Sequence, residues 1–462
     1  MSSARVRCEG AACPQIDIAS ADVRISGSET VGEELMPIIL GGYAASFGAE
    51  ADVKTGNNAF EKVVSLMDDG GFGDEVASYS IISEGTTEGF TDLLEGASEL
   101  AMSSRAARRS ELRAFAEAGH GNLSDLSQER IIAVDSLRVV VSPDNPVEAI
   151  AMEQLAQVYA GEISNWSQLG GLDQPITVYT RRDGTGTFDL FSEKVLRPGR
   201  RSVSPSATVV AGNIEMANAV AGDPGGIGFV GFAFERGAKT LSIVTECGIT
   251  VTADAFSAKT EEYPLERRLF VYSRNGDMSE DAQRLFEFLS QETVDGLVAK
   301  AGFVDLGVDQ GDQVRRAERL RTQMDQSTDQ WELSLMRELY IEKLEWDRLS
   351  TSLRFQVGSS ELDNKAKSDL GRLVRYLVES GADRARVVGF TDADGPFAAN
   401  LRLAERRALQ VVQELRAAGG DQLNGIDLTA RGFGELAPAG CNESFDGKRI
   451  NRRVEIWLPK EG

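Results

Sequence analysis

Short runs of β-branched and aromatic residues alternate with segments of helical spacing from about Asp22 to Asp309. Strands are predicted at Val139–Val141, Ile176–Tyr179 and Leu269–Tyr272. Helices are predicted where apolar residues recur at intervals of three and four, at Leu35–Phe47, Phe90–Leu94, Met152–Tyr159 and Ala282–Leu289. This alternation is typical of an α/β fold. Because about 290 residues are too many for one open sheet, we expect two lobes.

The composition excludes several classes of protein. The 462 residues include 49 Lys and Arg against 72 Asp and Glu, a net charge of −23, whereas nucleic-acid binders need cationic patches for the phosphate backbone. The single histidine, His120, excludes a multi-histidine metal site, and we expect neither a metal nor a cofactor. No apolar run approaches the roughly 18–20 residues of a membrane-spanning helix.

Residues 1–22 form a short polar lead-in. They contain no apolar h-region, so we expect no signal peptide in this sequence, which fits a cytosolic protein or a mature or trimmed secreted one. Cys8 and Cys13 are close enough for a short-loop disulfide, which would imply an oxidising compartment, but two unrelated thiols fit the sequence as well. Cys247 and Cys441 lie far apart in the sequence and are expected to be unpaired.

The chain changes character at about residue 311. From there to 349 it has no proline, no glycine after Gly311, and many charged residues. Apolar residues at spacings of three and four are Leu333, Met336, Tyr340 and Leu344. We expect one long helix or a helical pair that acts as a spacer over 311–350, with a solvated face. A coiled-coil partner site is the alternative, although sustained heptads are missing.

Three loops rich in Ser, Thr and Gly precede helical segments: Ser26–Thr30, Ser83–Thr87 and Asp183–Thr187. The third also follows a strand and the pair Arg181-Arg182. A helix N-terminus offers unpaired N–H groups, glycine allows close approach, and an arginine adds a full charge, so such loops suit an anion. The alternative is ordinary N-capping by Ser and Thr. No phosphate-binding P-loop and no G-x-G-x-x-G motif after a strand is present.

Further stretches accompany these loops, at Gly27–Val31, Ala101–Arg105, Ile132–Asp135, Val140–Pro146, Tyr159–Trp166, Arg181–Phe188 and Gly226–Val230. Together they make residues 23–308 similar to the substrate-binding protein of the bacterial phosphate ABC transporter, a type II periplasmic binding protein. The resemblance implies a two-lobed α/β clamp over 23–310 with its ligand between the lobes. Lobe one would comprise about 23–138 and 265–308, and lobe two about 139–264.

The resemblance also implies the ligands of a phosphate ion. The residues carried over by motif position, which would offer hydroxyl and backbone donors and one charge, are Thr30, Val31, Thr86, Arg181, Thr185, Gly186 and Thr187. Ser104 stands where some relatives carry an aspartate, which would accept the proton of hydrogen phosphate and so disfavour sulfate. We hypothesise that Asp135, just before an expected lobe crossing, supplies this acceptor; a plain loop residue is the alternative.

Residues 351–462 form a third unit. It holds 17 basic and 16 acidic residues, a net charge of +1, so the preceding 350 residues carry −24. Strands and helices alternate in the order βαβαββ, at Leu353–Val357, Ala366–Glu379, Arg386–Phe390, Leu401–Ala417, Ile426–Arg431 and Arg453–Leu458. Asp392 follows a strand and Arg407 lies on the next helix, so the two could hold a zwitterion, or form an internal salt bridge, or be solvated. Asp392 and Asp394 are not an acid/base pair, because no nucleophile or metal set accompanies them.

The segments Gly389–Gly395, Asn400–Ala408 and Lys448–Ile456 make 351–462 similar to the OmpA-like peptidoglycan-binding domain. In that family the positions of Asp392 and Arg407 grip the diaminopimelate of the peptide stem. The two resemblances imply a phosphate-binding protein of the Gram-negative periplasm, tethered non-covalently to the peptidoglycan of the cell envelope beneath the outer membrane.

Binding rather than catalysis is expected, with an ABC permease as a candidate partner. One alternative is a peptidoglycan-bound sensor or scaffold that uses the clamp for another oxyanion or for signalling. The other is an enzyme such as a phosphatase, although no serine–base pair, metal cluster or activated nucleophile is visible.

Overall fold

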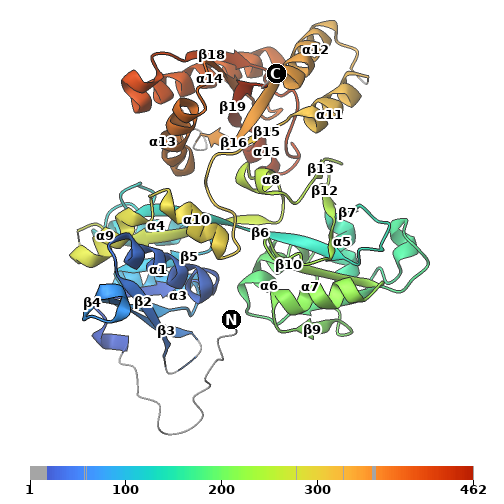
Figure 1. Cartoon of the computed structure of the whole chain (residues 1–462). Helices are drawn as coiled ribbons and strands as arrows, with labels where there is room; N and C mark the ends of the chain where they lie inside the picture. Colours follow the sequence, from blue (N-terminus) through green and yellow to red (C-terminus); the bar gives the residue numbers. More distant parts are fainter. Residues whose placement is uncertain are drawn as a thin grey trace. The chain divides into compact units, whose positions relative to one another are not determined.

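The computed structural model describes residues 18–56, 58, 60–276, 278–325, 327–355 and 361–460 (Figure 1). Cys8 and Cys13 lie outside the described residues, and the disulfide considered for them stays a prediction. The chain divides into two compact units. The first comprises Met1–Ala133 and Arg268–Ala301, and the second Val134–Arg267 and Gly302–Gly462.

The first unit is built on a sheet of mixed direction. Its strands, in spatial order, are β2 (Glu50–Thr55), β3 (Glu61–Met67), β4 (Glu75–Ile82), β1 (Val23–Gly27), β5 (Leu100–Ser103) and β14 (Glu266–Ser273), the last of which reaches into the second unit. β1 pairs in parallel with β4 and with β5, whereas β3 runs antiparallel to β4 and β14 antiparallel to β5. The carboxyl ends of three strands therefore meet at one edge.

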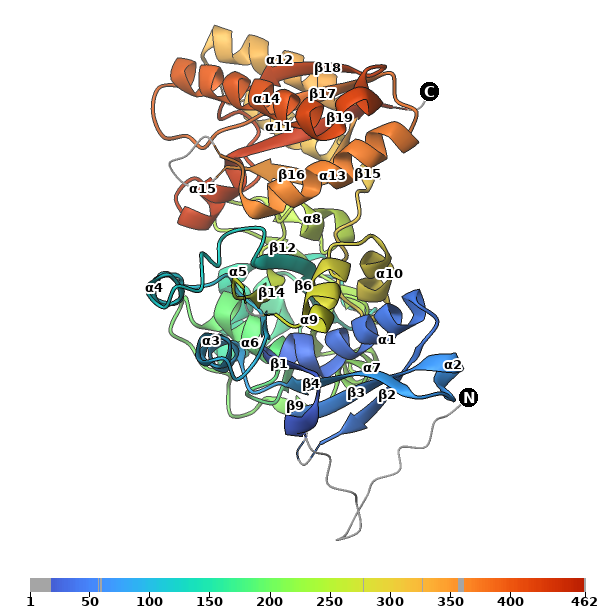
Figure 2. The same cartoon turned by 90° about the vertical axis from the view of Figure 1, so that its left-hand side faces the viewer.

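Helices follow these strands and cover the sheet. They are η1 (Ile18–Ser20), η2 (Val31–Leu35), α1 (Met36–Ser46), α2 (Asp68–Gly71), α3 (Thr86–Glu95), α4 (Arg109–Glu117), α9 (Glu280–Phe288) and α10 (Thr293–Lys300). Helix α1 packs beside α10, as Figure 2 shows. The helices predicted at 35–47, 90–94 and 282–289 are confirmed as parts of η2 with α1, of α3 and of α9.

The second unit begins with a lobe of its own. Strand β6 (Glu129–Val141) starts in the first unit and pairs antiparallel with β10 (Gly226–Gly231), followed by β8 (Thr177–Arg181) and β9 (Thr208–Val210) in parallel. Short strands complete it: β7 (Ala149–Ala151), β11 (Lys239–Thr240), β12 (Ser242–Val244) and β13 (Thr250–Val251). Its helices are α5 (Met152–Ala160), η3 (Trp166–Leu169), α6 (Gly186–Phe191), η4 (Ser192–Leu196), α7 (Asn213–Gly222) and α8 (Ala255–Lys259).

The C-terminal domain has a five-stranded sheet in the order β15 (Gln310–Gly311), β16 (Trp346–Arg354), β19 (Arg453–Pro459), β17 (Arg384–Gly389) and β18 (Asp427–Gly432). Its helices are α11 (Val314–Met324), α12 (Gln330–Glu345), α13 (Asn364–Glu379), α14 (Phe397–Gly419), η5 (Gly420–Leu423) and α15 (Phe445–Asn451). The expected order βαβαββ omits α15, a seven-residue helix between the last two strands.

Helices lie on both faces of this sheet. On β19, Ile456 belongs to the core under α13 and α14, whereas its neighbour Trp457 belongs to a separate core with Leu320 of α11 and Leu339 of α12. Successive strand residues point to opposite faces, so the two helix pairs cover opposite sides (Figure 1). The segment 311–350, expected to be a spacer, thus contains two helices that pack on the C-terminal sheet, and its last residues belong to β16.

A disulfide joins the lobe that begins the second unit to the C-terminal domain. Cys247, in the turn between β12 and β13, is bonded to Cys441, 194 residues later. The expectation that these two cysteines are unpaired is wrong, because tertiary packing brings together segments that sequence separation keeps apart. No helix among the described residues combines the length and apolarity needed to cross a bilayer.

Candidate functional site

Three loops of the first unit leave the carboxyl ends of neighbouring parallel strands. Thr30 follows β1, Thr86 follows β4 and Ser104 follows β5. Ligands of open α/β sheets bind at such carboxyl ends. We call these three loops, together with the loop after β8 in the second unit, the oxyanion loops.

Thr86 and Ser104 are brought into direct contact. The Ser104 N–H donates to Thr86 Oγ1 at 3.1 Å, and the two hydroxyl oxygens lie 3.3 Å apart. Thr86 is the first residue of α3, so its hydroxyl lies beside the unpaired N–H groups of a helix start. The neighbouring Arg105 is held by Glu111 at 2.7 Å and donates to Thr87 at 3.4 Å. Two predicted phosphate ligands therefore form one hydroxyl pair.

Glycine lets the first two loops approach each other. Gly27 has a φ of +135°, and a Cβ there would lie 2.1 Å from the Met102 carbonyl oxygen. A Cβ on Gly89 would lie 2.6 Å from the Cα of Gly27, so α3 packs directly on the end of β1. Between them, the Gly85 N–H donates to the Gly27 carbonyl at 2.9 Å. Side chains at 27 and 89 would push the loops apart.

Thr30 and Val31 start the helix that follows β1. The Val31 N–H donates to the Ser28 carbonyl at 3.2 Å, so it forms part of a turn. Val31 is fully buried and Thr30 is half-buried. The predicted backbone donor of Val31 is thus engaged within its own loop, and a ligand would have to share it.

The loop after β8 contains the other predicted ligands. Thr185 caps α6, accepting from the Phe188 N–H at 3.4 Å, and its hydroxyl donates to the Arg182 carbonyl at 3.0 Å. Its side chain therefore performs the N-capping considered as the alternative reading of the sequence. Phe191, the last residue of α6, stacks on Phe229 of β10 with ring centroids 4.1 Å apart, so the helix that begins at Gly186 and Thr187 is packed on the sheet through its far end.

Asp135 lies in strand β6 and is buried, so the alternative of a plain loop residue is wrong. Its Oδ2 accepts from Arg267 Nε at 3.0 Å. Arg267 Nη2 donates to the Gly186 carbonyl at 2.8 Å and so connects Asp135 to the loop after β8. Burial raises the pKa of the Asp135 carboxyl, although the Arg267 charge opposes this shift. The Asp135 oxygen is thus already engaged by a cation.

Arg181 is the last residue of β8 and is half-buried. It stands at the carboxyl end of a strand that pairs in parallel with both neighbours, which is the edge where ligands of open α/β sheets bind.

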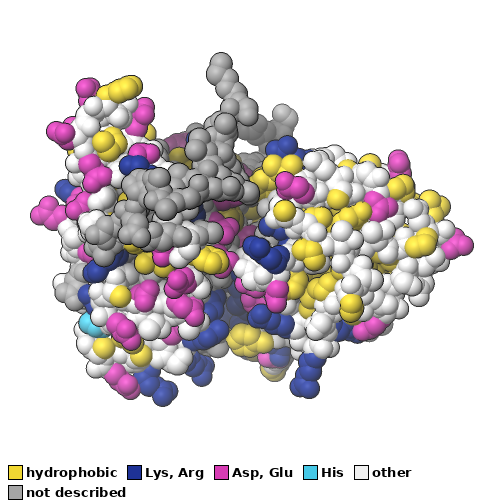
Figure 3. Space-filling model, turned by 90° about the horizontal axis from the view of Figure 1, so that it is seen from below, with side chains coloured by type: hydrophobic (Ala, Val, Ile, Leu, Met, Phe, Trp, Pro, Cys, Tyr) yellow, Lys and Arg dark blue, Asp and Glu magenta, His cyan; other side chains and the backbone are white. Residues whose placement is uncertain are grey.

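Figure 3 shows one face of the molecule, on which Lys and Arg side chains are interspersed with Asp and Glu side chains. Basic side chains are therefore exposed on this face in spite of the net negative charge of the chain.

The C-terminal domain pairs its predicted carboxylate with another arginine. Asp392 Oδ2 accepts from Arg452 Nη1 at 2.6 Å, and Asp392 Oδ1 accepts from the Asp394 N–H at 3.3 Å. Arg407, on α14, lies over the Phe355 ring at 5.1 Å, and its Nη1 is buried without a hydrogen-bond partner among the described residues. Burial lowers the pKa of Arg407, Arg452 lowers it further, and Asp392 opposes the shift.

Comparison with known families agrees with this architecture. Residues 44–291 match the model of the PBP superfamily domain, more than half of the chain. The chain belongs to the PBP superfamily. Residues 354–452 match the OmpA family, so an OmpA-family domain follows the PBP domain.

Similar proteins are known for both parts. The phosphate-binding protein PstS of Borreliella burgdorferi is 24% identical over 231 residues, which are 48% of this chain and 78% of that protein. The outer-membrane lipoprotein YfiB of Pseudomonas aeruginosa is 32% identical over 113 residues, 24% of this chain and 66% of YfiB. A solved ABC-type phosphate transport receptor from Vibrio cholerae covers 61% of this chain and 99% of its own, with 24% identity and a TM-score of 0.46.

Sequence reasoning missed two arginines that hold predicted site residues of the PBP and OmpA-family domains. Arg267 is paired with Asp135, 132 residues away, and Arg452 with Asp392, 60 residues away. The signal for Arg267 was weak: a charged pair, Arg267-Arg268, at the start of an apolar strand. Arg452 stood inside a motif already singled out, but nothing in its spacing indicated its partner.

Proposed function

We propose that the PBP domain captures inorganic phosphate with its oxyanion loops and that the OmpA-family domain tethers the protein non-covalently to peptidoglycan. The observation that carries the first part is the contact of Thr86 with Ser104 at the carboxyl ends of parallel strands. These hydroxyls and helix-start N–H groups are donors of the kind that bind oxyanions. The name of the PstS relative, a phosphate-binding protein, supports the same ligand.

In this proposal the ligand set is Thr30, Val31, Thr86, Ser104, Arg181, Thr185, Gly186 and Thr187. Arg181 supplies the charge, in a fork that matches two phosphate oxygens. Asp135 acts as a positioning residue, because its carboxylate holds Arg267, which in turn holds the Gly186 carbonyl.

A calorimetric titration of phosphate into the full chain tests this role, with sulfate as the competing anion. We expect saturable phosphate binding that Arg181→Ala weakens by about 100-fold, the size of a lost charged hydrogen-bond pair. The control is Arg182→Ala, which removes an exposed neighbouring arginine and should bind phosphate normally. Equal affinity in both variants would exclude Arg181 as the ligand.

The second part of the proposal rests on Asp392, Arg452 and Arg407. The Asp392 carboxylate can accept from an ammonium, and Arg407, whose Nη1 has no hydrogen-bond partner among the described residues, can donate to a carboxylate. These are the two ends of a zwitterionic amino acid. Diaminopimelate in a peptide stem has these two groups, and we propose it as the ligand.

Co-sedimentation with purified sacculi that contain diaminopimelate tests the tether. We expect the full chain to sediment with the sacculi, and Arg407→Ala to remain in solution. Arg406→Ala is the matched control, because Arg406 is exposed on the same helix. If Arg406→Ala and Arg407→Ala sediment equally, Arg407 does not bind the stem peptide.

A periplasmic location, in association with the cell wall of a Gram-negative envelope, accompanies this function. The bond between Cys247 and Cys441 supports it, because disulfides persist in oxidising compartments. Delivery of phosphate to an ABC permease is the proposed use of the captured ion. Recovery of a permease in a pull-down from membranes supports transport, whereas recovery of another partner supports the sensor or scaffold role.

A further inference from the structure

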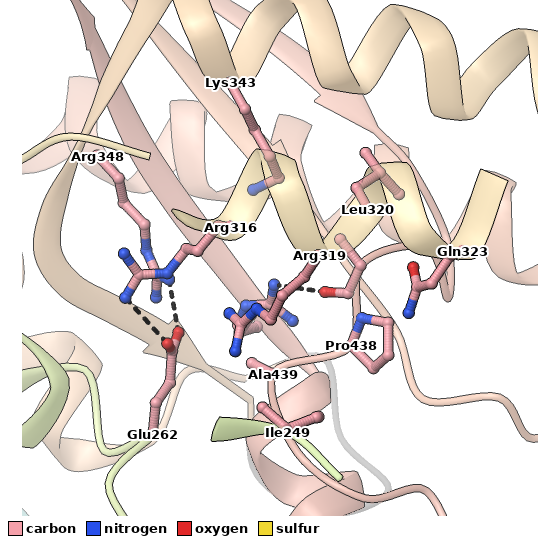
Figure 4. Close-up of a pocket in the computed structure, with 12 residues that line it drawn as sticks. Ile249, Glu262, Arg316, Arg319, Leu320, Gln323, Lys343, Arg348, Pro438 and Ala439 are labelled. Atoms are coloured by element: carbon pink, nitrogen blue, oxygen red, sulfur yellow. Dashed lines mark hydrogen bonds and ion pairs between the residues drawn. The ribbon is translucent and has the colours of Figure 1, made fainter. Parts of the chain in front are cut away.

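A small cavity of about 40 Å³ lies where the C-terminal domain meets the segment from Ile249 to Glu262 of the same compact unit. Its charged lining residues are Glu262, Arg316, Arg319, Lys343, Arg348 and Arg453. Figure 4 shows Glu262 on one side, with the arginines and Lys343 directed toward it from the other. We call this the cationic cavity. A volume of this size holds a small ion or a few water molecules.

Carboxylates compensate only part of this charge. Glu262 contacts Arg348 at 2.5 Å and Arg316 at 3.1 Å. The second carboxylate, Glu455, is buried next to the cavity and contacts Arg348 at 3.1 Å and Arg453 at 2.7 Å. Asp254 acts on Arg316 at longer range. Three of the five cations thus contact at least one of two carboxylates, and Arg319 and Lys343 have no ion pair among the described residues.

Several buried N–H donors in the cavity have no hydrogen-bond acceptor among the described residues. Arg316 Nε and Arg348 Nε are buried without hydrogen-bond partners among the described residues. Among the residues that the structure describes, Arg319 has no carboxylate within ion-pair distance, and its guanidinium donates only a long hydrogen bond of 3.5 Å to the Thr250 carbonyl. Buried donors without acceptors are unfavourable, and an anion would satisfy them.

The electrostatic surroundings of Lys343 also indicate an excess of positive charge in the cavity. It is buried between the Trp457 ring, 4.9 Å from Nζ, and Gln313, whose Oε1 accepts from Nζ at 2.9 Å. Burial lowers the pKa of Lys343 to about 7; Glu455 opposes this shift, and the charges of Arg453 and Arg348 add to it. The side chain therefore lies in a surplus of positive charge.

We propose that the cationic cavity binds a small inorganic oxyanion, in addition to any ion bound by the oxyanion loops. Guanidinium and ammonium groups only donate, and the carboxylates Glu262 and Glu455 are engaged by arginines, so the cavity has no free charged group that selects for the proton of hydrogen phosphate. It binds sulfate as well as phosphate, held by Arg316, Arg319, Lys343 and Arg348.

A bound ion would join two parts of the second unit. Arg319 and Lys343 belong to helices of the C-terminal domain, whereas Glu262 follows α8 of the preceding lobe. The ion would neutralise the surplus charge where the two meet. Sulfate then raises the thermal stability of the chain as its concentration exceeds the dissociation constant.

Calorimetric titration of sulfate into the full chain, at constant ionic strength, tests the site. We expect one saturable sulfate site, weakened about tenfold or more by Arg319→Gln, the loss of one charged contact. Arg321→Gln is the matched control: it removes one positive charge from an exposed position of α11 and should leave sulfate binding unchanged. Absence of saturable binding up to about 10 mM sulfate, or equal weakening by both variants, would overturn the proposal.

Crystals of the full chain grown with selenate provide a second measurement that does not depend on a variant. Selenate has the shape and charge of sulfate and an anomalous scatterer. An anomalous peak within the cavity, among Arg316, Arg319 and Lys343, supports the proposal. Ordered water there, with selenate found only elsewhere, would overturn it.

Discussion

The oxyanion loops and the cationic cavity offer an anion two kinds of surroundings. The loops of the first unit offer hydroxyls and helix-start N–H groups, and Arg105, the cation next to Ser104 in the sequence, is held by Glu111. The cavity offers five cationic side chains, three of them arginines within contact of the carboxylates Glu262 and Glu455.

The two sites differ in whether their hydrogen-bond donors are satisfied when no ion is bound. Thr86 and Ser104 satisfy each other when no ligand is present, since a hydroxyl both donates and accepts. Guanidinium groups cannot do this, so Arg316 and Arg348 each keep a buried Nε–H without an acceptor among the described residues. Mostly neutral donors with one arginine, Arg181, suit a site that must open and release its ion, whereas an excess of buried charge suits an ion that stays as part of the structure.

The largest effect that separates the two sites is expected from the disulfide. Cys247→Ser combined with Cys441→Ser opens a loop of 194 residues, and we expect a loss of about 3 kcal/mol in the free energy of unfolding. Cys441 lies close in sequence to the cavity residues Pro438 and Ala439, so sulfate binding should weaken while phosphate binding by the oxyanion loops persists.

Urea denaturation and the two titrations measure these effects. Adding reductant to the wild type should reproduce the loss of stability, and adding it to the double variant should change nothing further. A wild-type chain whose unfolding midpoint is the same with and without reductant would contradict the prediction.

The next effect concerns Asp135. Asp135→Asn removes the carboxylate charge that faces Arg267, and we expect a loss of about 2 kcal/mol in the free energy of unfolding. Because the carboxylate positions Arg267 instead of contacting the ion, the ratio of phosphate to sulfate affinity should stay the same. Calorimetry of the variant with both anions, in the Arg319→Gln background that weakens the cationic cavity, measures this ratio for the oxyanion loops. A fall in the ratio would show that Asp135 accepts the proton of hydrogen phosphate.

Asp135 also shows how much of the candidate site can be predicted from the sequence. Its position before a lobe crossing was visible, and so were the Ser/Thr/Gly loops, because a turn and the helix after it depend on neighbouring residues. The partner was not visible, since Arg267 lies 132 residues away and only β-sheet pairing brings it near. The same holds for the disulfide between Cys247 and Cys441, because no local sequence pattern indicates a bond between cysteines 194 residues apart.

The elements show a similar division. Strands β6, β8 and β14 contain the predicted runs of β-branched and aromatic residues. Helix α15 was missed because seven residues are too few to show an amphipathic period, and its start depends on Ser444, which accepts from the Gly447 N–H at 3.0 Å. Packing of α11 and α12 against Trp457 was equally hidden, because their charged sequence indicated a solvated spacer.

A smaller expected effect is the pH dependence of the free energy of unfolding that arises from Lys343 in the cationic cavity. Lys343 has a pKa of about 7 in the folded protein, below the value of about 10.4 expected for an unfolded chain. Between these values the unfolded state binds a proton that the folded state lacks, so the free energy of unfolding rises with pH, by up to about 1.4 kcal/mol per pH unit. Sulfate in the cationic cavity favours protonated Lys343 and should flatten this rise.

Denaturant unfolding from pH 7 to about pH 10, with and without sulfate, measures the slope. Lys343→Met should remove this contribution, whereas Lys367→Met, at an exposed position of α13, should keep it. Parallel curves for the wild type and Lys343→Met would show that Lys343 does not titrate in this range.

The smallest expected effect is in the oxyanion loops. Thr86→Val keeps the shape of the side chain but removes the hydroxyl that accepts from the Ser104 N–H at 3.1 Å. Loss of one neutral hydrogen-bonding group corresponds to about 1 kcal/mol, so phosphate affinity should fall about fivefold. Sulfate binding in the cationic cavity should not change.

Thr91→Val, on the exposed side of the same helix, is the matched control for calorimetry. Equal phosphate affinity in the two variants would mean that Thr86 organises its loop without binding the ion, and the neutral donors of the comparison would then be the remaining hydroxyls and backbone N–H groups of the oxyanion loops.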